Sequence, residues 1–95
     1  MRRKRKRIHN YLKRCRRERG LTQQEVARIL GLESSSMISR WEKGICLPET
    51  LNALRMAILY DTTVDYVYED LRLELQDKLS LRTDILQGVK VGQHD

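Results

Sequence analysis

The pattern of apolar and polar positions between residues 22 and 44 predicts two short helices joined by a tight turn. Thr22 and Glu25 have the spacing of a capping box, in which a hydroxyl and a carboxylate satisfy free N–H groups at a helix start. The first helix should therefore begin at Gln23. Apolar residues then recur at helical spacing until Gly31, where the chain can turn through a positive φ.

The second helix of this pair combines an apolar anchor with a polar outer surface. A serine from the polar run 33–36 is expected to cap its start, and Gly44 ends it. Ile38 and Trp41 have the spacing of inward-facing positions, which predicts that both pack in the core. The side chains that remain outside are small and polar.

Three further helices are expected around this pair. One begins at Ile8 and is closed by Gly20, another starts at Pro48, whose missing N–H costs nothing there, and the last covers residues 64–71 after a turn at residues 61–63. The apolar faces that we expect to be buried are Ile8, Tyr11, Leu12 and Cys15, then Leu51, Leu54 and Ile58, then Val64, Val67 and Leu71.

The segment from Arg72 onward is compatible with more than one structure. Its leucines and valines alternate, which is typical of a hairpin around residues 76–78. A helix explains more positions, because only Leu73 lies outside its apolar face and Gly88 provides a stop. That face comprises Leu71, Leu75, Leu79, Leu81, Ile85 and Leu86. We expect a helix that packs on its own domain or on a second subunit, with a hairpin or disorder as the alternatives.

Length and composition favour one small all-α domain. The chain has 95 residues, of which 40% are hydrophobic, with one proline and no phenylalanine. We expect a disordered basic arm at residues 1–7, a five-helix domain at residues 8–71 and a C-terminal extension at residues 72–95. No apolar run approaches the roughly 18 residues that span a bilayer, and no signal peptide is evident. These features indicate a soluble cytoplasmic protein without a membrane partner.

The sequence offers no chemistry for catalysis or for a metal. The two cysteines lie far apart and the two histidines lie near opposite ends, which argues against a zinc site or a disulfide framework. No nucleophile has a plausible histidine, no phosphate-binding loop is present and no carboxylate pair has a cleft. We therefore expect no enzyme activity, no metal and no cofactor.

The positive charge of the chain is concentrated at one end. Its net charge is +6, but the first twenty residues hold eleven Lys or Arg against one Glu, whereas the last 35 are net acidic. A basic pole of this density attracts nucleic acid first and an anionic membrane second. The alternative is a tail that only keeps the chain soluble. No exposed aromatic platform for RNA is predicted, because Trp41 is assigned to the core.

Several of these residues resemble the helix-turn-helix family of phage lambda repressor and Cro, also called the XRE family. The resemblance lies in LTQQEVARILGL, ISRWEKG, the proline four residues after Gly44 and VDYVYEDL, and it extends from about Leu12 to Leu71. Several such marks in the right order are far more specific than a lone helix-turn-helix pattern. The resemblance implies a lambda-repressor-like fold and a DNA-binding transcriptional regulator, most simply a repressor that binds a palindromic double-stranded operator as a homodimer.

The second helix of the pair supplies the candidate base contacts. A duplex major groove is about 12 Å wide and admits one α-helix, whose outward side chains must be able to meet base edges. The residues with that character are Ser35, Ser36, Ser39 and Arg40, and the resemblance places the family's base contacts on the same positions. Arg40 can bond a guanine in bidentate fashion. At least one of the serines is expected to act as the helix cap instead.

Other residues are expected to contact the DNA backbone or to hold the fold. Candidate backbone contacts are Gln23, Gln24, Lys43 and the arm residues Arg2, Arg3, Lys4, Arg5, Lys6 and Arg7. By resemblance, Gln23 matches a backbone-contacting glutamine, and Arg16 and Glu42 match a structural ion pair. The arm would contact phosphates or enter the minor groove.

Two departures from the family pattern leave alternatives open. The segment 31–41 is one residue longer than is common, so the register of the serines at the groove can differ by one position. The loop 45–47 is apolar where many relatives carry cations. Either the basic arm supplies that charge, or these residues are an exposed apolar triplet that meets another protein surface. The competing function is therefore an antitoxin-like or adaptor protein whose main partner is another protein.

Overall fold

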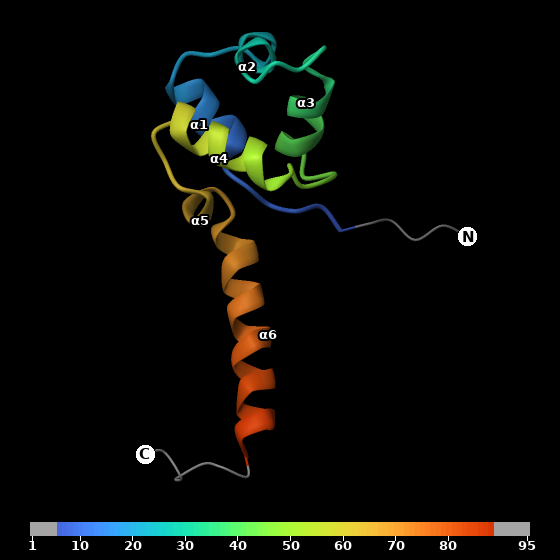
Figure 1. Ribbon diagram of the computed structural model, residues 1–95, viewed down its shortest axis with the longest axis vertical. Helices are drawn as coiled ribbons and strands as arrows, with labels where there is room; N and C mark the ends of the chain where they lie inside the picture. The colour runs from blue at the N-terminus through green and yellow to red at the C-terminus, as the bar shows by residue number, and fades with distance from the viewer. Residues whose placement is uncertain (1–5, 89–95) are drawn as a thin grey trace, which may run out of the picture.

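Six helices and no strands are present in the computed structural model, which describes residues 6–88 (Figure 1). The helices are α1 (Leu12–Glu18), α2 (Gln23–Ile29), α3 (Ser36–Glu42), α4 (Thr50–Leu59), α5 (Val64–Val67) and α6 (Glu69–Gln87). The first five gather into one body, and α6 projects away from it (Figure 1). The predicted all-α class is confirmed. Most of the predicted arm, residues 1–5, lies outside the described range, as do residues 89–95.

Three of the local signals for helix ends are confirmed. Thr22 and Glu25 form the predicted capping box, with the Glu25 N–H donating to the Thr22 hydroxyl at 3.0 Å and the Thr22 N–H donating to the Glu25 carboxylate at 2.9 Å. Gly31 has the predicted positive φ, 75°. Thr63 caps α5 by accepting the Tyr66 N–H at 3.1 Å. These contacts join residues at most three positions apart, so sequence spacing alone reveals them.

The first helix is shorter than predicted, because the segment before it bonds to distant parts of the chain. The prediction that it begins at Ile8 is wrong: α1 begins at Leu12. The Ile8 N–H donates to the Gly44 carbonyl at 2.9 Å, and the Asn10 side-chain amide donates to the Trp41 carbonyl at 3.0 Å. Residues 8–10 thus lie across the end of α3 instead of continuing α1.

The predicted apolar face of α4 is wrong. Leu51, Leu54 and Ile58 are 61%, 48% and 79% exposed, whereas Met56 is 1% exposed and Asn52 is also buried. The buried positions of α4 carry an asparagine, a methionine and an alanine, so the more hydrophobic leucine positions predicted the wrong inward face. The predicted start of this helix at Pro48 is also wrong. Glu49 is the N-cap residue, and α4 begins two residues after Pro48.

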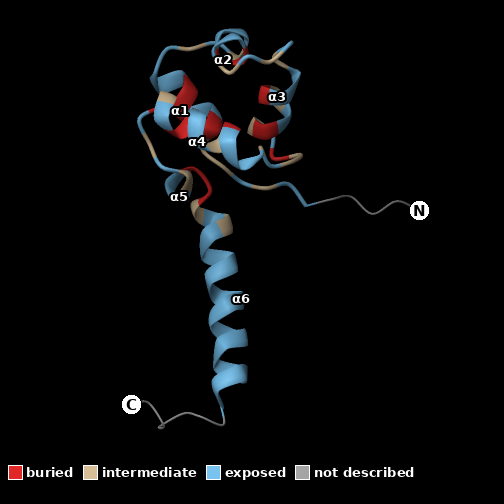
Figure 2. Cartoon of the chain, in the orientation of Figure 1, coloured by how far each residue is buried: buried red, intermediate tan, exposed pale blue. Residues whose placement is uncertain are grey.

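The C-terminal segment is helical, which confirms the preferred prediction up to Gln87 and rejects the hairpin. The predicted helix at residues 64–71 is divided, because Tyr68, with φ −113° and ψ 40°, leaves the helical range between α5 and α6. The predicted domain boundary after residue 71 falls inside α6. None of the residues of α6 is buried (Figure 2).

The core lies among α1 to α5 and includes both predicted anchors of α3. Ile38 is fully buried and Trp41 is 4% exposed. The buried cluster consists of Leu12, Cys15, Val26, Ala27, Ile38, Trp41, Met56, Tyr60, Val67 and Tyr68. Figure 2 shows these buried positions on the facing sides of the helices. The core therefore holds α3 through the face that carries Ile38 and Trp41, and the opposite face of α3 is exposed to solvent.

Replacing Gly44 by alanine is expected to destabilise the fold more than replacing Gly31. Both glycines have a positive φ, 73° and 75°, which costs an alanine roughly 1–2 kcal/mol. An added Cβ at Gly44 would also overlap the backbone carbonyl of Ile8, whereas nothing lies within 4 Å of one at Gly31. Chemical unfolding followed by Trp41 fluorescence measures the free energy of unfolding of each variant. Equal losses of stability in the two variants would show that the close approach of Ile8 to Gly44 contributes nothing.

Candidate nucleic-acid interface

The outward face of α3 is defined by its buried face. Side chains on an α-helix rotate by about 100° per residue, so the positions opposite Ile38 are Ser36, Arg40 and Lys43. All three are exposed. Ser39 lies to one side of this face and is half-buried. The structure therefore brings an arginine, a lysine and a serine to the centre of the exposed surface of α3.

Ser35 does not share this surface. It precedes the first residue of α3, is half-buried, and by helical rotation lies nearer to the side of Ile38 than to that of Arg40. The predicted serine cap also differs in detail. Ser35 occupies the cap position but its side chain makes no capping bond, and Ser34 accepts the Ser36 N–H at 3.3 Å instead. The Ser34 and Ser36 hydroxyl oxygens are 2.7 Å apart.

Met37 is a residue of this surface that sequence reasoning missed. It is 38% exposed and lies beside Arg40 on the opposite flank from Ser39. The search for polar side chains passed over it, although its position between Ser36 and the buried Ile38 was visible in the sequence. An apolar side chain at this place suits contact with a thymine methyl group, which is itself exposed in the major groove.

A buried polar network fixes the end of α3 against α1 and α2. The Arg16 Nε donates to Glu42 Oε2 at 2.6 Å and its Nη2 donates to Oε1 at 3.1 Å. A third nitrogen, Nη1, donates to the Leu21 carbonyl at 2.8 Å. The two charged side chains are only 9% and 3% exposed. The hydrogen bond to Glu42 raises the pKa of Arg16 further above its ordinary value, so the Arg16 guanidinium is charged throughout the physiological range.

Gln23 belongs to the same network. Its side-chain amide donates to Glu42 Oε1 at 2.9 Å, which links the first turn of α2 to the last turn of α3. An amide group has two N–H donors, so one remains for another acceptor. Gln24 is exposed. The two candidate glutamines therefore differ, since one is held in place and the other is free to move.

The basic arm leaves the domain next to the C-terminal end of α3. Arg7 Nη1 donates to the Lys43 carbonyl at 3.3 Å, and the next residue is held at Gly44. Lys6 and Arg7 are both exposed. The candidate residues Arg2, Arg3, Lys4 and Arg5 lie outside the described range. The described contacts therefore bring the start of the arm to the same end of α3 as Lys43.

The loop between α3 and α4 is less exposed than expected. Leu47 is 49% exposed, but Ile45 and Cys46 are half-buried, and Cys46 packs against the core. The interpretation of residues 45–47 as an exposed apolar triplet is therefore wrong for two of the three. They cover the core where the chain passes from α3 to α4.

Comparison with known proteins agrees with this geometry. A family model described as helix-turn-helix matches residues 12–67, which span α1 to α5. Searches of curated proteins and of solved structures gave no significant match. Among residues 6–88, no helix has the length and apolar character needed to cross a membrane. With α2 and α3 arranged as a helix pair whose second helix is exposed, the chain belongs to the lambda repressor and Cro-like, or XRE-type, helix-turn-helix family of DNA-binding transcription regulators.

Proposed function

We propose that the protein is a repressor that binds a palindromic double-stranded operator as a homodimer. The observation that supports this most directly is the exposed face of α3, where Ser36, Arg40 and Lys43 lie opposite the buried Ile38. A helix anchored in this way can enter a major groove without losing its packing. The polar side chains needed to read base edges are then already on the outside.

Arg40 is the residue best suited to read a base. Its guanidinium is exposed and, among residues 6–88, donates no hydrogen bond and forms no ion pair, so its forked donors are available for guanine O6 and N7. Ser36 and Ser39 flank it with short hydroxyls that allow close approach, and Met37 adds an apolar contact. Ser35 is the weakest of the four predicted base contacts because it lies toward the domain.

Contacts to phosphates would position α3 in the groove. Lys43 and the arm approach from one end of α3, while Gln23 and Gln24 approach from the start of α2. The second amide proton of Gln23 can bond a phosphate while the first stays on Glu42. Arg2 to Arg7 add charge that binds the duplex without regard to sequence. Specificity and affinity would thus come from different parts of the chain.

A homodimer follows from the expected symmetry of the site. Two copies on half-sites about one helical turn apart present both α3 helices to the same face of the duplex. An antitoxin-like or adaptor function is the second candidate, because exposed apolar side chains on α4 and α6 offer a surface to another protein. Co-purification with a small basic partner would favour that second function.

Selection of binding sites from a random duplex pool tests the proposed function. The expected result is one palindromic motif whose half-sites lie about 10 base pairs apart, and a reporter promoter that carries it should lose expression when the protein is supplied. Titration of the same site at several salt concentrations then tests the arm. Deletion of residues 2–7 should weaken binding to all sequences alike and flatten the salt dependence. A pool without an enriched motif would contradict sequence-specific binding.

A further inference from the structure

Most of the apolar face of α6 has no partner among the described residues, although Leu71 at its start packs against the core. Of the six leucine and isoleucine positions that share this face, five are 47–79% exposed: Leu75, Leu79, Leu81, Ile85 and Leu86. The helix is 19 residues long, about 28 Å, and beyond its first turns it projects away from the other helices (Figure 2). Large apolar side chains gathered on one exposed helix face mark an interaction site.

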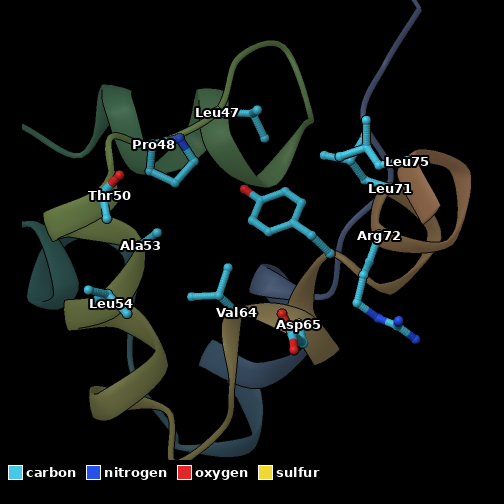
Figure 3. A pocket seen from close by; sticks show the side chains of 11 residues that line it. Leu47, Pro48, Thr50, Ala53, Leu54, Val64, Asp65, Leu71, Arg72 and Leu75 are labelled. Atoms are coloured by element: carbon cyan, nitrogen blue, oxygen red, sulfur yellow. The ribbon is translucent and has the colours of Figure 1, made fainter. Parts of the chain in front are cut away.

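The exposed face of α6 continues into a groove on the domain. The groove has a volume of about 410 Å³ and lies between α4, α5 and the first turns of α6. Its walls are mainly apolar and include Leu47, Leu54, Val64, Leu71 and Leu75, which Figure 3 shows around the same space. Because Leu71 and Leu75 belong both to the groove and to the apolar face, the two features form one surface.

Four charged residues divide this face in a regular order. Asp70, Glu74, Lys78 and Arg82 follow one another at intervals of four, so they form a single ridge along the helix. The ridge is acidic in its first half and basic in its second half, and it passes between the apolar side chains. Lys78 Nζ already lies 3.4 Å from Glu74 Oε1 within the helix, so a partner with apolar side chains and the opposite order of charges would give both residues a second ionic contact.

A second copy of α6 has the opposite order of charges when it runs in the opposite direction. If the two-fold axis lies at the level of Gln76 along the helix, Glu74 is level with Lys78 of the partner subunit, and Asp70 is level with Arg82 of the partner subunit. Two parallel copies would instead place Lys78 against Lys78 and Arg82 against Arg82 within an apolar interface, where like charges are costly. Residues 89–95 of the same chain contain only two valines as large apolar side chains, which is too few to cover the face.

We propose that two copies of the chain dimerise through antiparallel packing of α6 against α6. The proposal rests on the homodimer of the proposed function and specifies how it is built. The charged ridges pair as described, and Leu71 faces Leu81 of the partner subunit. In the same register, Ile85 and Leu86 lie level with α5 of the partner and fill the groove beside it. Asp70, which also contacts His9 Nδ1 at 3.1 Å, has a second carboxylate oxygen for Arg82 of the partner subunit.

Disulfide formation between two engineered chains tests the direction of packing. One chain carries Leu71→Cys and the other Leu81→Cys, both in a Cys46→Ala background, since the remaining Cys15 is buried. In the antiparallel dimer each residue is about 15 Å from its own copy along the helix, beyond the reach of a disulfide. Mild oxidation without DNA should therefore cross-link the mixture at least tenfold more than either chain alone. Cross-linking of each chain with itself would show parallel packing and overturn the proposal.

Reversing the charge of the basic half of the ridge tests whether a second copy of α6 binds this face. Lys78→Glu with Arg82→Glu makes the ridge acidic throughout, which should weaken self-association at least tenfold in sedimentation equilibrium at low salt. The matched control is Lys13→Glu with Arg17→Glu, the same charge change on exposed positions of α1, which should leave the mass of the dimer unchanged. Circular dichroism checks that both variants remain folded. A wild-type chain that is monomeric at concentrations up to 100-fold above those used for DNA binding would overturn the proposal.

The tests of this dimer interface can fail or succeed independently of the test of operator binding. A cross-linked antiparallel dimer that selects no DNA motif would support this interface and contradict operator binding. A palindromic motif selected by a chain that shows no cross-link between residues 71 and 81 would support operator binding and contradict this interface.

Discussion

Replacing Glu42 by alanine is expected to lower the free energy of unfolding by about 3–5 kcal/mol, because it leaves a buried charge without a partner. The Arg16 side chain is 9% exposed and gives two of its hydrogen bonds to Glu42. Gln23 loses its acceptor in the same variant. Chemical unfolding can be followed through Trp41, the one tryptophan of the chain.

The matched control is an ion pair of the same chemistry on the surface. Arg14 and Glu18 approach to 3.6 Å with side chains 62% and 64% exposed, so Glu18→Ala should cost less than about 1 kcal/mol. The Glu42 variant, studied where it is still folded, should select the same DNA motif as the wild type. Equal stability of the two variants, or a changed motif, would contradict a structural role for Glu42.

Replacing Arg40 by alanine is expected to weaken binding to the selected operator roughly 10- to 100-fold, which corresponds to the ~1–3 kcal/mol of one bidentate base contact. The side chain is exposed and lies opposite the buried face of α3, so its loss should leave the stability of the fold nearly unchanged. Binding to unrelated DNA should fall much less, because phosphate contacts supply most of that affinity. Fluorescence anisotropy with both duplexes measures the ratio.

Arg40→Lys separates base recognition from charge. It keeps the positive charge but removes the planar fork that fits guanine O6 and N7. We expect this variant to lose most of the preference for the operator while it keeps its affinity for unrelated DNA. Wild-type preference in Arg40→Lys would assign Arg40 to a phosphate.

The parts of the fold that could be predicted from the sequence are those set by neighbouring residues. The capping box at Thr22, the turn at Gly31 and the cap at Thr63 each depend on contacts within a few positions. The burial of Ile38 and Trp41 also followed from local spacing, because α3 has a single apolar face between two clear ends.

The errors arose where distant segments decide the outcome. Helical periodicity continues back to Ile8, but its backbone bonds to Gly44, 36 positions away, and this ends the helix early. Leu51, Leu54 and Ile58 have the more hydrophobic pattern on α4, yet Met56 faces the core. On the proposed dimer, Leu54 borders the groove that receives the partner, so hydrophobicity there reflects an interface that a single chain does not contain.

The sequence predicted which residues make up the candidate site, but it did not predict which of them lie at the centre of the exposed face of α3. The sequence indicated that residues 35–40 carry the polar surface of the second helix. The buried Ile38 places Ser36 and Arg40 at its centre, and the start of α3 at Ser36 shows that Ser35 lies toward the domain. Met37, which is 38% exposed, was missed because only polar side chains were considered as base contacts.

Methylation protection of guanine N7 on the selected operator tests the central claim most directly, because N7 is exposed in the major groove. If α3 reads the groove through Arg40, the wild-type protein protects one symmetry-related guanine in each half-site, and Arg40→Ala loses protection at those guanines while it retains the others. Unchanged protection in Arg40→Ala, or no protection of any guanine N7 in an operator that contains guanines, would contradict the assignment of α3 as the reading helix.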